Sequence, residues 1–194
     1  RMNSANLCSA WHLETIDSPL GPVSLLLSLE EAGGLTALHF GDGESLRQRH
    51  TLRHPTGTIL EVSGHRITAQ LREYFAGSVR AIDALATEAP GTPFQQMVWR
   101  ELRRIPVGEV ISYGELARRI GQPTAVRAVA LANARNPIAI VVPCHRVIAA
   151  DGSLHGYAGG IERKQWLLEH EARSTGRGAP AVRGLGSPRL FGLD

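Results

Sequence analysis

Residues 112–137 read SYGELARRIGQPTAVRAVALANARNP and predict two short helices joined by a turn. Ser112 and Glu115 have the spacing of a capping box, in which both side chains satisfy backbone N–H groups at a helix start. A Gly-Gln-Pro turn would end this helix, and Thr124 would cap the second helix over residues 125–134. The pair is compatible with a DNA-binding helix-turn-helix and, on spacing alone, equally with an ordinary helical hairpin.

A longer helix is predicted before this pair. Thr92 has the character of an N-cap and is followed by proline at the first helical position, so a helix should run from there to about Arg104. Apolar residues recur on one face of it at helical spacing. They are Phe94, Val98, Leu102 and Ile105.

The segment after the pair begins with Asn136-Pro137, which ends the second helix. Residues 138–142 are continuously apolar and predict a short, fully buried strand. A loop rich in glycine and alanine (150–160) leads to a last helix over about residues 162–171. Residues 173–194 are rich in Gly, Pro and Arg and predict a mobile basic tail.

The N-terminal half predicts a sheet with one helix. Residues 11–40 form extended runs, and Asp17-Ser18-Pro19 and Gly33-Gly34 interrupt them as hairpin turns, which indicates a small antiparallel sheet. Residues 63–75 predict an amphipathic helix that ends at Gly77 and covers this sheet. Its apolar face would carry Ile67, Leu71, Tyr74 and Phe75. Nothing in this half carries obvious chemistry, so a structural role is expected.

The fold class that follows is α+β. It consists of a small N-terminal antiparallel sheet with a covering helix, then a mostly helical C-terminal domain with the helix-turn-helix and an active-site loop. We predict domain boundaries at residues 8–88, a structural domain, and 89–172, the domain that contains the helix pair and Cys144. The tail would occupy residues 173–194.

Length and composition exclude several classes of protein. A chain of 194 residues with 43% hydrophobic content can bury a core, as one domain or as two small domains in contact. No apolar run reaches the roughly 18 residues of a membrane span, and the first residues lack the pattern of a signal peptide, so a cytoplasmic location is expected. Cys8 and Cys144 are too few for a disulfide framework, and the scattered histidines lack metal-ligand spacing. We expect no metal and no cofactor.

The charge is concentrated in the C-terminal half. The whole chain carries a net charge of +3, whereas residues 94–135 hold seven arginines and three glutamates, a surplus of 7 − 3 = +4. A basic patch of this kind fits a nucleic-acid partner, but it also fits an ordinary solvated face.

Cys144 is the candidate nucleophile. It stands between Pro143 and His145 at the end of the predicted buried strand. A neighbouring histidine can act through a bound water as the base that makes thiolate, the reactive form of cysteine. Glu171, at the end of the last helix, is a candidate to orient that histidine. Cysteine and histidine alone would also suit a cysteine hydrolase or a redox thiol.

Several longer motifs follow one another along the chain and help to choose among these classes of protein. They are Thr92-Pro93-Phe94-Gln95, Ile105-Pro106-x-Gly108, Ser112-Tyr113-Gly114, Arg127-Ala128-Val129, Asn136-Pro137-Ile138, Pro143-Cys144-His145-Arg146-Val147-Ile148, Gly156-Tyr157-Ala158-Gly159-Gly160 and Lys164-x-Trp166-Leu167-Leu168-x-x-Glu171. With them, residues 91–171 resemble the O6-alkylguanine-DNA alkyltransferases, also called methylated-DNA-protein-cysteine methyltransferases. Ser18-Pro19-Leu20-Gly21 and Leu71-x-x-Tyr74-Phe75-x-Gly77 are similar to the N-terminal half of that family.

The resemblance implies catalytic roles for matched residues. Cys144 would accept the alkyl group, His145 would activate it through water, and Glu171 would polarise His145. Asn136 would hold the turn that carries the site, by hydrogen-bonding backbone. Tyr113 would lie beside the phosphate of the target nucleotide and donate to the departing guanine ring.

The resemblance also implies binding roles. The backbone carbonyl of Val147, the side chain of Tyr157 and the backbone amide of Ala158 would frame the guanine. The second helix of the pair would lie along the minor groove with Arg127, the one charged residue in it, filling the gap that a flipped nucleotide leaves. Its other DNA-binding positions would be Ala125, Val126 and Ala130.

The implied activity is single-turnover DNA repair: the alkyl group of O6-alkylguanine, and of O4-alkylthymine if that lesion is accepted, moves irreversibly onto Cys144. The partner would be duplex DNA that contains the lesion, and we expect a monomer that could cluster on DNA. Alkyltransferase-like lesion-binding modules share the scaffold but lack the cysteine, so Cys144 argues against that class. A transcription regulator would use the same helix pair, and a cysteine hydrolase would show turnover on an ester or amide.

Overall fold

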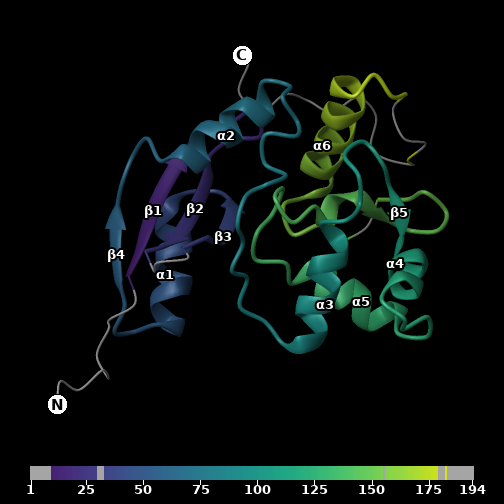
Figure 1. The fold of residues 1–194 in the computed structure, drawn as a ribbon, viewed down its shortest axis with the longest axis horizontal. Coiled ribbons are helices and arrows are strands. Elements are labelled where there is room, and N and C mark those ends of the chain that lie inside the picture. The colour runs from purple at the N-terminus through teal and green to yellow at the C-terminus, as the bar shows by residue number, and fades with distance from the viewer. Residues whose placement is uncertain (1–9, 30–32, 155, 179–181, 183–194) are drawn as a thin grey trace.

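The computed structural model describes residues 10–29, 33–154, 156–178 and 182. It shows a sheet with two helices packed beside a mostly helical part (Figure 1). The first, the sheet module, contains β1 (Ala10–Ile16), β2 (Val23–Ser28), β3 (Leu35–Phe40), α1 (Gly43–Arg53), β4 (Thr58–Glu61) and α2 (Arg66–Phe75). The second, the helical module, contains α3 (Pro93–Leu102), β5 (Ile111–Ser112), α4 (Tyr113–Arg119), α5 (Val126–Ala134), the 3₁₀ turn η1 (Cys144–Arg146), β6 (Val147–Ile148) and α6 (Ile161–Ser174). The predicted α+β class is confirmed.

The sheet is mixed rather than antiparallel as predicted. Its strand order is β3-β2-β1-β4; the β1–β2 and β2–β3 pairs are antiparallel, and β4 runs parallel to β1. The reason is α1, which returns the chain across the sheet between β3 and β4 so that both strands run the same way. The sequence did not predict α1, because Leu46 is the one buried residue in an otherwise polar helix and no apolar stripe marks it.

Both faces of the sheet are covered. Successive side chains of a strand point to opposite faces, so Leu25 and Leu27 pack in a core with Leu71 of α2, whereas Leu26 packs with Leu46 of α1. The predicted amphipathic helix is therefore present as α2. It begins at Arg66 rather than at residue 63, and Gly77 follows it with a φ of 111°.

The two modules share the larger core. Ile16, Leu20 and Leu38 of the sheet module lie in one buried cluster with residues of the helical module, including Val98, Leu102, Ile138 and Leu167. Backbone hydrogen bonds join the modules at the edge strand β3: the amide of Leu38 donates to Pro137 O at 2.9 Å, and the amide of Ala139 donates to Leu38 O at 3.0 Å. The segment that leads to Cys144 is therefore fastened to the sheet.

The predicted strand at residues 138–142 is wrong. The segment is buried, but Ile138 forms only an isolated bridge with Leu38, and the chain then turns. The amide of Val142 donates back to Ile138 O at 3.0 Å, and Ile140 has a φ of 68°. A continuous apolar run reports burial and does not by itself distinguish a strand from a compact turn.

The helix pair is present as α4 and α5, with one wrong cap. Ser112 accepts from the Glu115 amide as predicted, but the Glu115 carboxylate pairs with arginines of its own helix. Thr124 does not cap α5. The cap residue is Ala125, whose amide closes a turn on Gln122 O at 2.9 Å, so the threonine lies outside the helix start.

A full capping box forms instead at the start of α3. The Thr92 side chain accepts from the Gln95 amide, and the Gln95 side chain accepts from the Thr92 amide. The indole N–H of Trp99 in α3 donates to Ala132 O of α5 at 2.9 Å, which joins α3 to the helix pair.

The last helix is longer than predicted and includes the first residues of the predicted tail. α6 continues to Ser174, Thr175 donates its amide to Glu171 O at 3.0 Å, and Arg177 pairs with Glu109 at 2.7 Å. Thr175 and Arg177 are therefore held against the helical module, and most of the predicted tail lies outside the described residues, as does Cys8. No helix in the described part of the chain is long and apolar enough to span a membrane.

Glu14 provides a test of how α2 is attached to the sheet. Its buried carboxylate accepts from the amides of Gly64 (2.8 Å) and His65 (3.1 Å) and from the Thr68 hydroxyl (3.1 Å). Glu14→Ala leaves these donors without an acceptor, so we expect the free energy of unfolding to fall by about 2 kcal/mol in urea denaturation. Glu73→Ala, at an exposed position of α2, should change it by less than about 0.5 kcal/mol. Equal losses would contradict this role of Glu14.

Candidate active site

Cys144 lies in η1, at the end of a turn that Asn136 organises. The Asn136 amide nitrogen lies 2.8 Å from Val142 O, 3.3 Å from Ile138 O and 3.0 Å from the Cys144 sulfur, and its oxygen accepts from the Ile138 amide at 3.0 Å. One side chain thus replaces the strand pairing that the turn lacks and also touches the thiol.

The thiol is held mainly in its protonated form. Burial raises the pKa of Cys144, and the Asn136 hydrogen bond and the positive charge of Lys164 oppose this rise only in part. A buried thiol with a raised pKa is a poor nucleophile until a base removes its proton. The chemistry of this site therefore depends on a base close to Cys144.

His145 has the environment of such a base. Its side chain is fully buried, and its Nε2 lies 2.9 Å from Oε1 of Glu171. Burial lowers the pKa of His145, and the neighbouring Glu171 raises it only in part, so the imidazole is neutral near neutral pH. Its Nδ1 is buried and has no hydrogen-bond partner among the described residues.

Glu171 determines which nitrogen of His145 carries the proton. Burial alone would raise the pKa of Glu171, but His145 and Arg146 outweigh it and hold that pKa well below its usual range. Arg146 binds both carboxylate oxygens, at 2.9 Å through Nε and 2.8 Å through Nη2. An ionised carboxylate only accepts hydrogen bonds, so the proton must be on Nε2. Nδ1 then carries a free lone pair that can take a proton.

The structure brings two tyrosines near the thiol. Tyr113 is the first residue of α4 and is half-buried; burial raises its pKa, and the charge of Cys144 adds to the rise. Tyr157 packs against Phe40 with ring centroids 6.3 Å apart, and its buried hydroxyl has no partner among the described residues. Burial, followed by the charge of Cys144, also raises the pKa of Tyr157.

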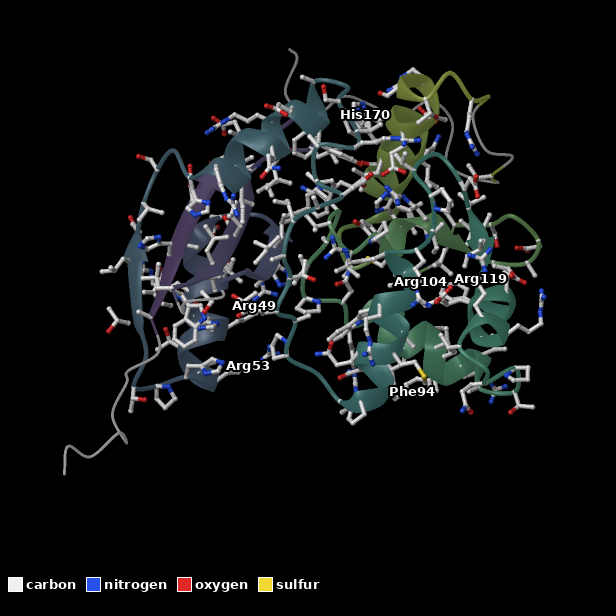
Figure 2. The ribbon with its side chains drawn as sticks, viewed as in Figure 1. Arg49, Arg53, Phe94, Arg104, Arg119 and His170 are labelled. Carbon is white, nitrogen blue, oxygen red and sulfur yellow. The ribbon has the colours of Figure 1, made fainter. Side chains whose placement is uncertain are left out.

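A cavity of about 1140 Å³ gives access to the thiol. Cys144, Asn136, Tyr157 and Ala158 line it, and the side toward the sheet module includes Arg49 of α1, which Figure 2 labels together with Arg53. Val147 is buried in β6. The sequence-predicted residues Cys144, His145, Glu171, Asn136, Tyr113 and Tyr157 are therefore gathered around one point.

Apart from Tyr113, the predicted DNA-binding residues lie elsewhere, on α5 and at its start. Arg127 is exposed and forms no ion pair with any residue that the structure describes, whereas Arg104 and Arg119, labelled in Figure 2, pair with Glu101 and Glu115. Val126 is 36% exposed, Ala125 and Ala130 are half-buried, and Leu131, which the sequence did not single out, is 52% exposed.

Sequence reasoning assigned no role to three buried polar residues at this site, Arg146, Lys164 and Tyr74. Arg146 also donates to Ile105 O at 2.6 Å, and Lys164 donates to Val147 O at 2.6 Å. Burial lowers the pKa of Lys164 to about 8, against the opposing influence of Cys144. A signal for Lys164 was present: it lies seven residues before Glu171 with Leu167 and Leu168 between them, so it shares their buried helix face.

Comparisons of the sequence with known proteins point to one family. Residues 93–173 match the family model described as the 6-O-methylguanine DNA methyltransferase, DNA binding domain. The chain is 45% identical over 162 residues to the methylated-DNA–protein-cysteine methyltransferase of Shigella flexneri, covering 81% of this chain and 94% of that protein. It is 47% identical over 163 residues to the protein of the same name from Mycobacterium bovis, covering 82% and 92%.

Solved structures give the same result. The crystal structure of Mycobacterium tuberculosis OGT in complex with DNA superposes with a TM-score of 0.69 at 44% identity, covering 88% of this chain and 96% of that one. The O6-methylguanine-DNA methyltransferase of Pyrococcus kodakaraensis superposes with a TM-score of 0.52 at 26% identity, covering 83% and 98%.

Asn136 offers a test of the thiol environment. Because the Asn136 amide favours the thiolate, Asn136→Ala should raise the pKa of Cys144 by roughly one unit. The measurement is the pH dependence of alkylation by a small haloacetamide, in a Cys8→Ser background so that one thiol reports. Asn133→Ala removes an amide that donates to the Cys144 carbonyl at 3.4 Å rather than to its sulfur, and should shift the thiol pKa much less. A folded Asn136→Ala protein with an unchanged thiol pKa would contradict this account.

Proposed function

This chain belongs to the methylated-DNA–protein-cysteine methyltransferase family, and from that membership we propose that it repairs DNA by direct reversal, moving an alkyl group from O6 of guanine to Cys144. The observation that carries the proposal is the proton path beside the thiol. The buried Nδ1 of His145 has no partner in the described structure, and Nε2 is held by an ionised Glu171. That arrangement leaves one base free beside a thiol that needs one.

The reaction needs one proton transfer and one displacement. His145 Nδ1 takes the Cys144 proton through a water molecule, and the thiolate attacks the alkyl carbon. The carbon–sulfur bond forms as the carbon–O6 bond breaks, and the bonding pair leaves with the guanine. The Tyr113 hydroxyl gives the departing ring a proton, and the proton that His145 took from Cys144 returns to that hydroxyl through water. The thioether has no easy route to hydrolysis, so each protein would act once.

The guanine must leave the duplex before this chemistry, because O6 lies inside the base stack. Tyr157, the Val147 carbonyl and the Ala158 amide would frame the flipped base, with Lys164 holding the Val147 carbonyl through a hydrogen bond. The exposed face of α5, including Ala125, Val126 and Ala130, would follow the minor groove, and Arg127 would occupy the vacated position. The helices contact DNA without reading base edges, so binding is sequence-independent.

Substrate, assembly and domain organisation complete the proposal. The partner is duplex DNA with O6-alkylguanine, and the protein acts as a monomer. Residues 8–88 serve as the structural domain, and residues 89–172 contain the DNA-binding and reacting groups. The last turn of α6, Thr175 and Arg177 belong with the second of these domains.

Stoichiometry tests the reaction. With an excess of duplex that contains O6-methylguanine, we expect one methyl group per chain, found by mass spectrometry on the peptide that contains Cys144. Cys144→Ser should bind the duplex without transfer, because a serine hydroxyl is a much weaker nucleophile near neutral pH. Cys8→Ser is the matched control and should react like the parent protein. Repeated turnover, or a methyl group on Cys8, would refute the proposal.

Base flipping has its own test. Arg127→Ala should slow transfer from duplex DNA by about tenfold or more, because leaving the stack costs a few kcal/mol that the arginine offsets. Transfer from free O6-benzylguanine, which has no stack to leave, should be unchanged. Arg72→Ala, on the outer face of α2, is the matched control for loss of one positive charge. If Arg127→Ala impairs both substrates equally, the arginine supports the fold instead.

A further inference from the structure

Tyr74 is a buried phenol that the proposed reaction does not use. It belongs to α2 of the sheet module and is 0% exposed. Its hydroxyl donates to Oε1 of Glu171 at 2.9 Å, the same oxygen that lies 2.9 Å from His145 Nε2. Burial, and then the charge of Glu171, raises the pKa of Tyr74 well above its usual value, so the phenol keeps its proton and remains a donor. The sheet module therefore reaches the hydrogen-bond chain behind Cys144.

Packing between the modules does not require this hydroxyl. The Tyr74 carbonyl lies 2.7 Å from Nε2 of His170, and the two rings meet edge to face with centroids 5.4 Å apart. Phe75 contacts Trp166, which stacks on His170 at 4.6 Å. Figure 2 labels His170 on α6, on the side that α2 approaches. The aromatic rings and one backbone group join the helices, so the hydroxyl can be removed while the contact stays.

We propose that Tyr74 is a positioning residue, through which the sheet module limits how strongly Glu171 holds the Nε2 proton of His145. Its importance for repair rests on the function proposed above. Oε1 of Glu171 accepts from Tyr74, His145 and Arg146 (2.8 Å), and donors that share one oxygen divide its negative charge. Arg146 and the Gly108 amide, 3.3 Å from Oε2, keep the carboxylate in place when one donor is lost.

Removing the Tyr74 hydroxyl leaves the other ionisable groups around His145 and Glu171 in place. Burial is the largest influence on the pKa of His145 and lowers it; Glu171 raises it, and Arg146 and Lys164 lower it. Cys144 precedes His145 in η1, and Tyr157 and His170 also interact with the Glu171 charge. Removing the Tyr74 hydroxyl concentrates the carboxylate charge on Nε2–H, which favours the protonated imidazole. The pKa of His145 should therefore rise.

Tyr74→Phe tests the proposal in the whole, unalkylated protein. The pKa of His145 is measured by nuclear magnetic resonance from its imidazole shifts, assigned with His145→Asn. We expect it to rise by about half a unit or more. The rate of alkyl transfer from methylated duplex should also be measured as a function of pH. Its acid limb should move to higher pH by the same amount, and the rate on the alkaline plateau should be unchanged. The acid limb should move to higher pH because His145 acts as a base only when it is neutral, and a higher pKa keeps it protonated up to a higher pH.

Thr68→Val is the matched control. Thr68 lies on the same helix and is equally buried, but its hydroxyl contacts Glu14 and His65 O instead of the site. It should leave the His145 pKa unchanged. An unchanged His145 pKa in folded Tyr74→Phe, or an equal shift in Thr68→Val, overturns the proposal.

A ring-fluorinated tyrosine at position 74 should change the His145 pKa in the opposite direction. It provides a second variant if Tyr74→Phe folds poorly. Fluorination strengthens the phenol as a donor, so the His145 pKa should fall; a rise or no change overturns the proposal. The titration does not depend on alkyl transfer. If the parent protein transfers no alkyl group, the proposed function fails, while the resonance measurement still decides whether Tyr74 acts on His145 through Glu171.

Discussion

The burial of one negative charge organises this structure. Glu171 is completely buried, and a carboxylate in a protein interior is tolerated only when it is paired and hydrogen-bonded. Its partners come from separate parts of the chain: Tyr74 from α2, the Gly108 amide from the turn after α3, and His145 and Arg146 from η1. Satisfying this one group therefore requires α2, α3, η1 and α6 to meet in a single arrangement.

Arg146 balances the charge of Glu171 and so affects the protonation state of His145. Because a permanent cation already balances Glu171, His145 can stay neutral beside a carboxylate and keep a free lone pair on Nδ1. Burial acts in the opposite sense on the neighbouring thiol, since it raises the pKa of Cys144. The thiol therefore stays largely protonated, while an imidazole nitrogen that can accept a proton lies on the next residue.

The sheet module takes part in this site although its sequence suggested only a structural role. Its edge strand β3 holds the turn before Cys144 through Leu38, and Tyr74 on α2 reaches Glu171. DNA contacts are proposed on the outside of α5, where Arg127 is exposed, away from the shared core. The two sides of the helical module therefore have different requirements. The side facing the core must pack closely and pair its buried charges, whereas the side proposed to face DNA must stay exposed and fit the groove.

Local sequence signals, such as a helix cap or a regular apolar spacing, were enough to predict some of the secondary-structure elements. Thr92-Pro93 placed the start of α3, apolar spacing placed α2, and the adjacency of Cys144 and His145 with the surrounding motifs placed the family, which the relatives confirm. The sequence could not place α1, β4 or the turn at residues 138–142. A mostly polar helix has no apolar stripe that marks it, and a continuous apolar run shows that a segment is buried without showing which segments pack against it. Tyr74 and Glu171 are 97 residues apart, and their contact exists only because a buried charge draws distant donors together. By itself the sequence determined the family, the start of α3 and the amphipathic helix α2, and it made Cys144 and His145 neighbours; the tertiary structure alone decided which groups surround these two residues, since burial and long-range pairing have no local pattern.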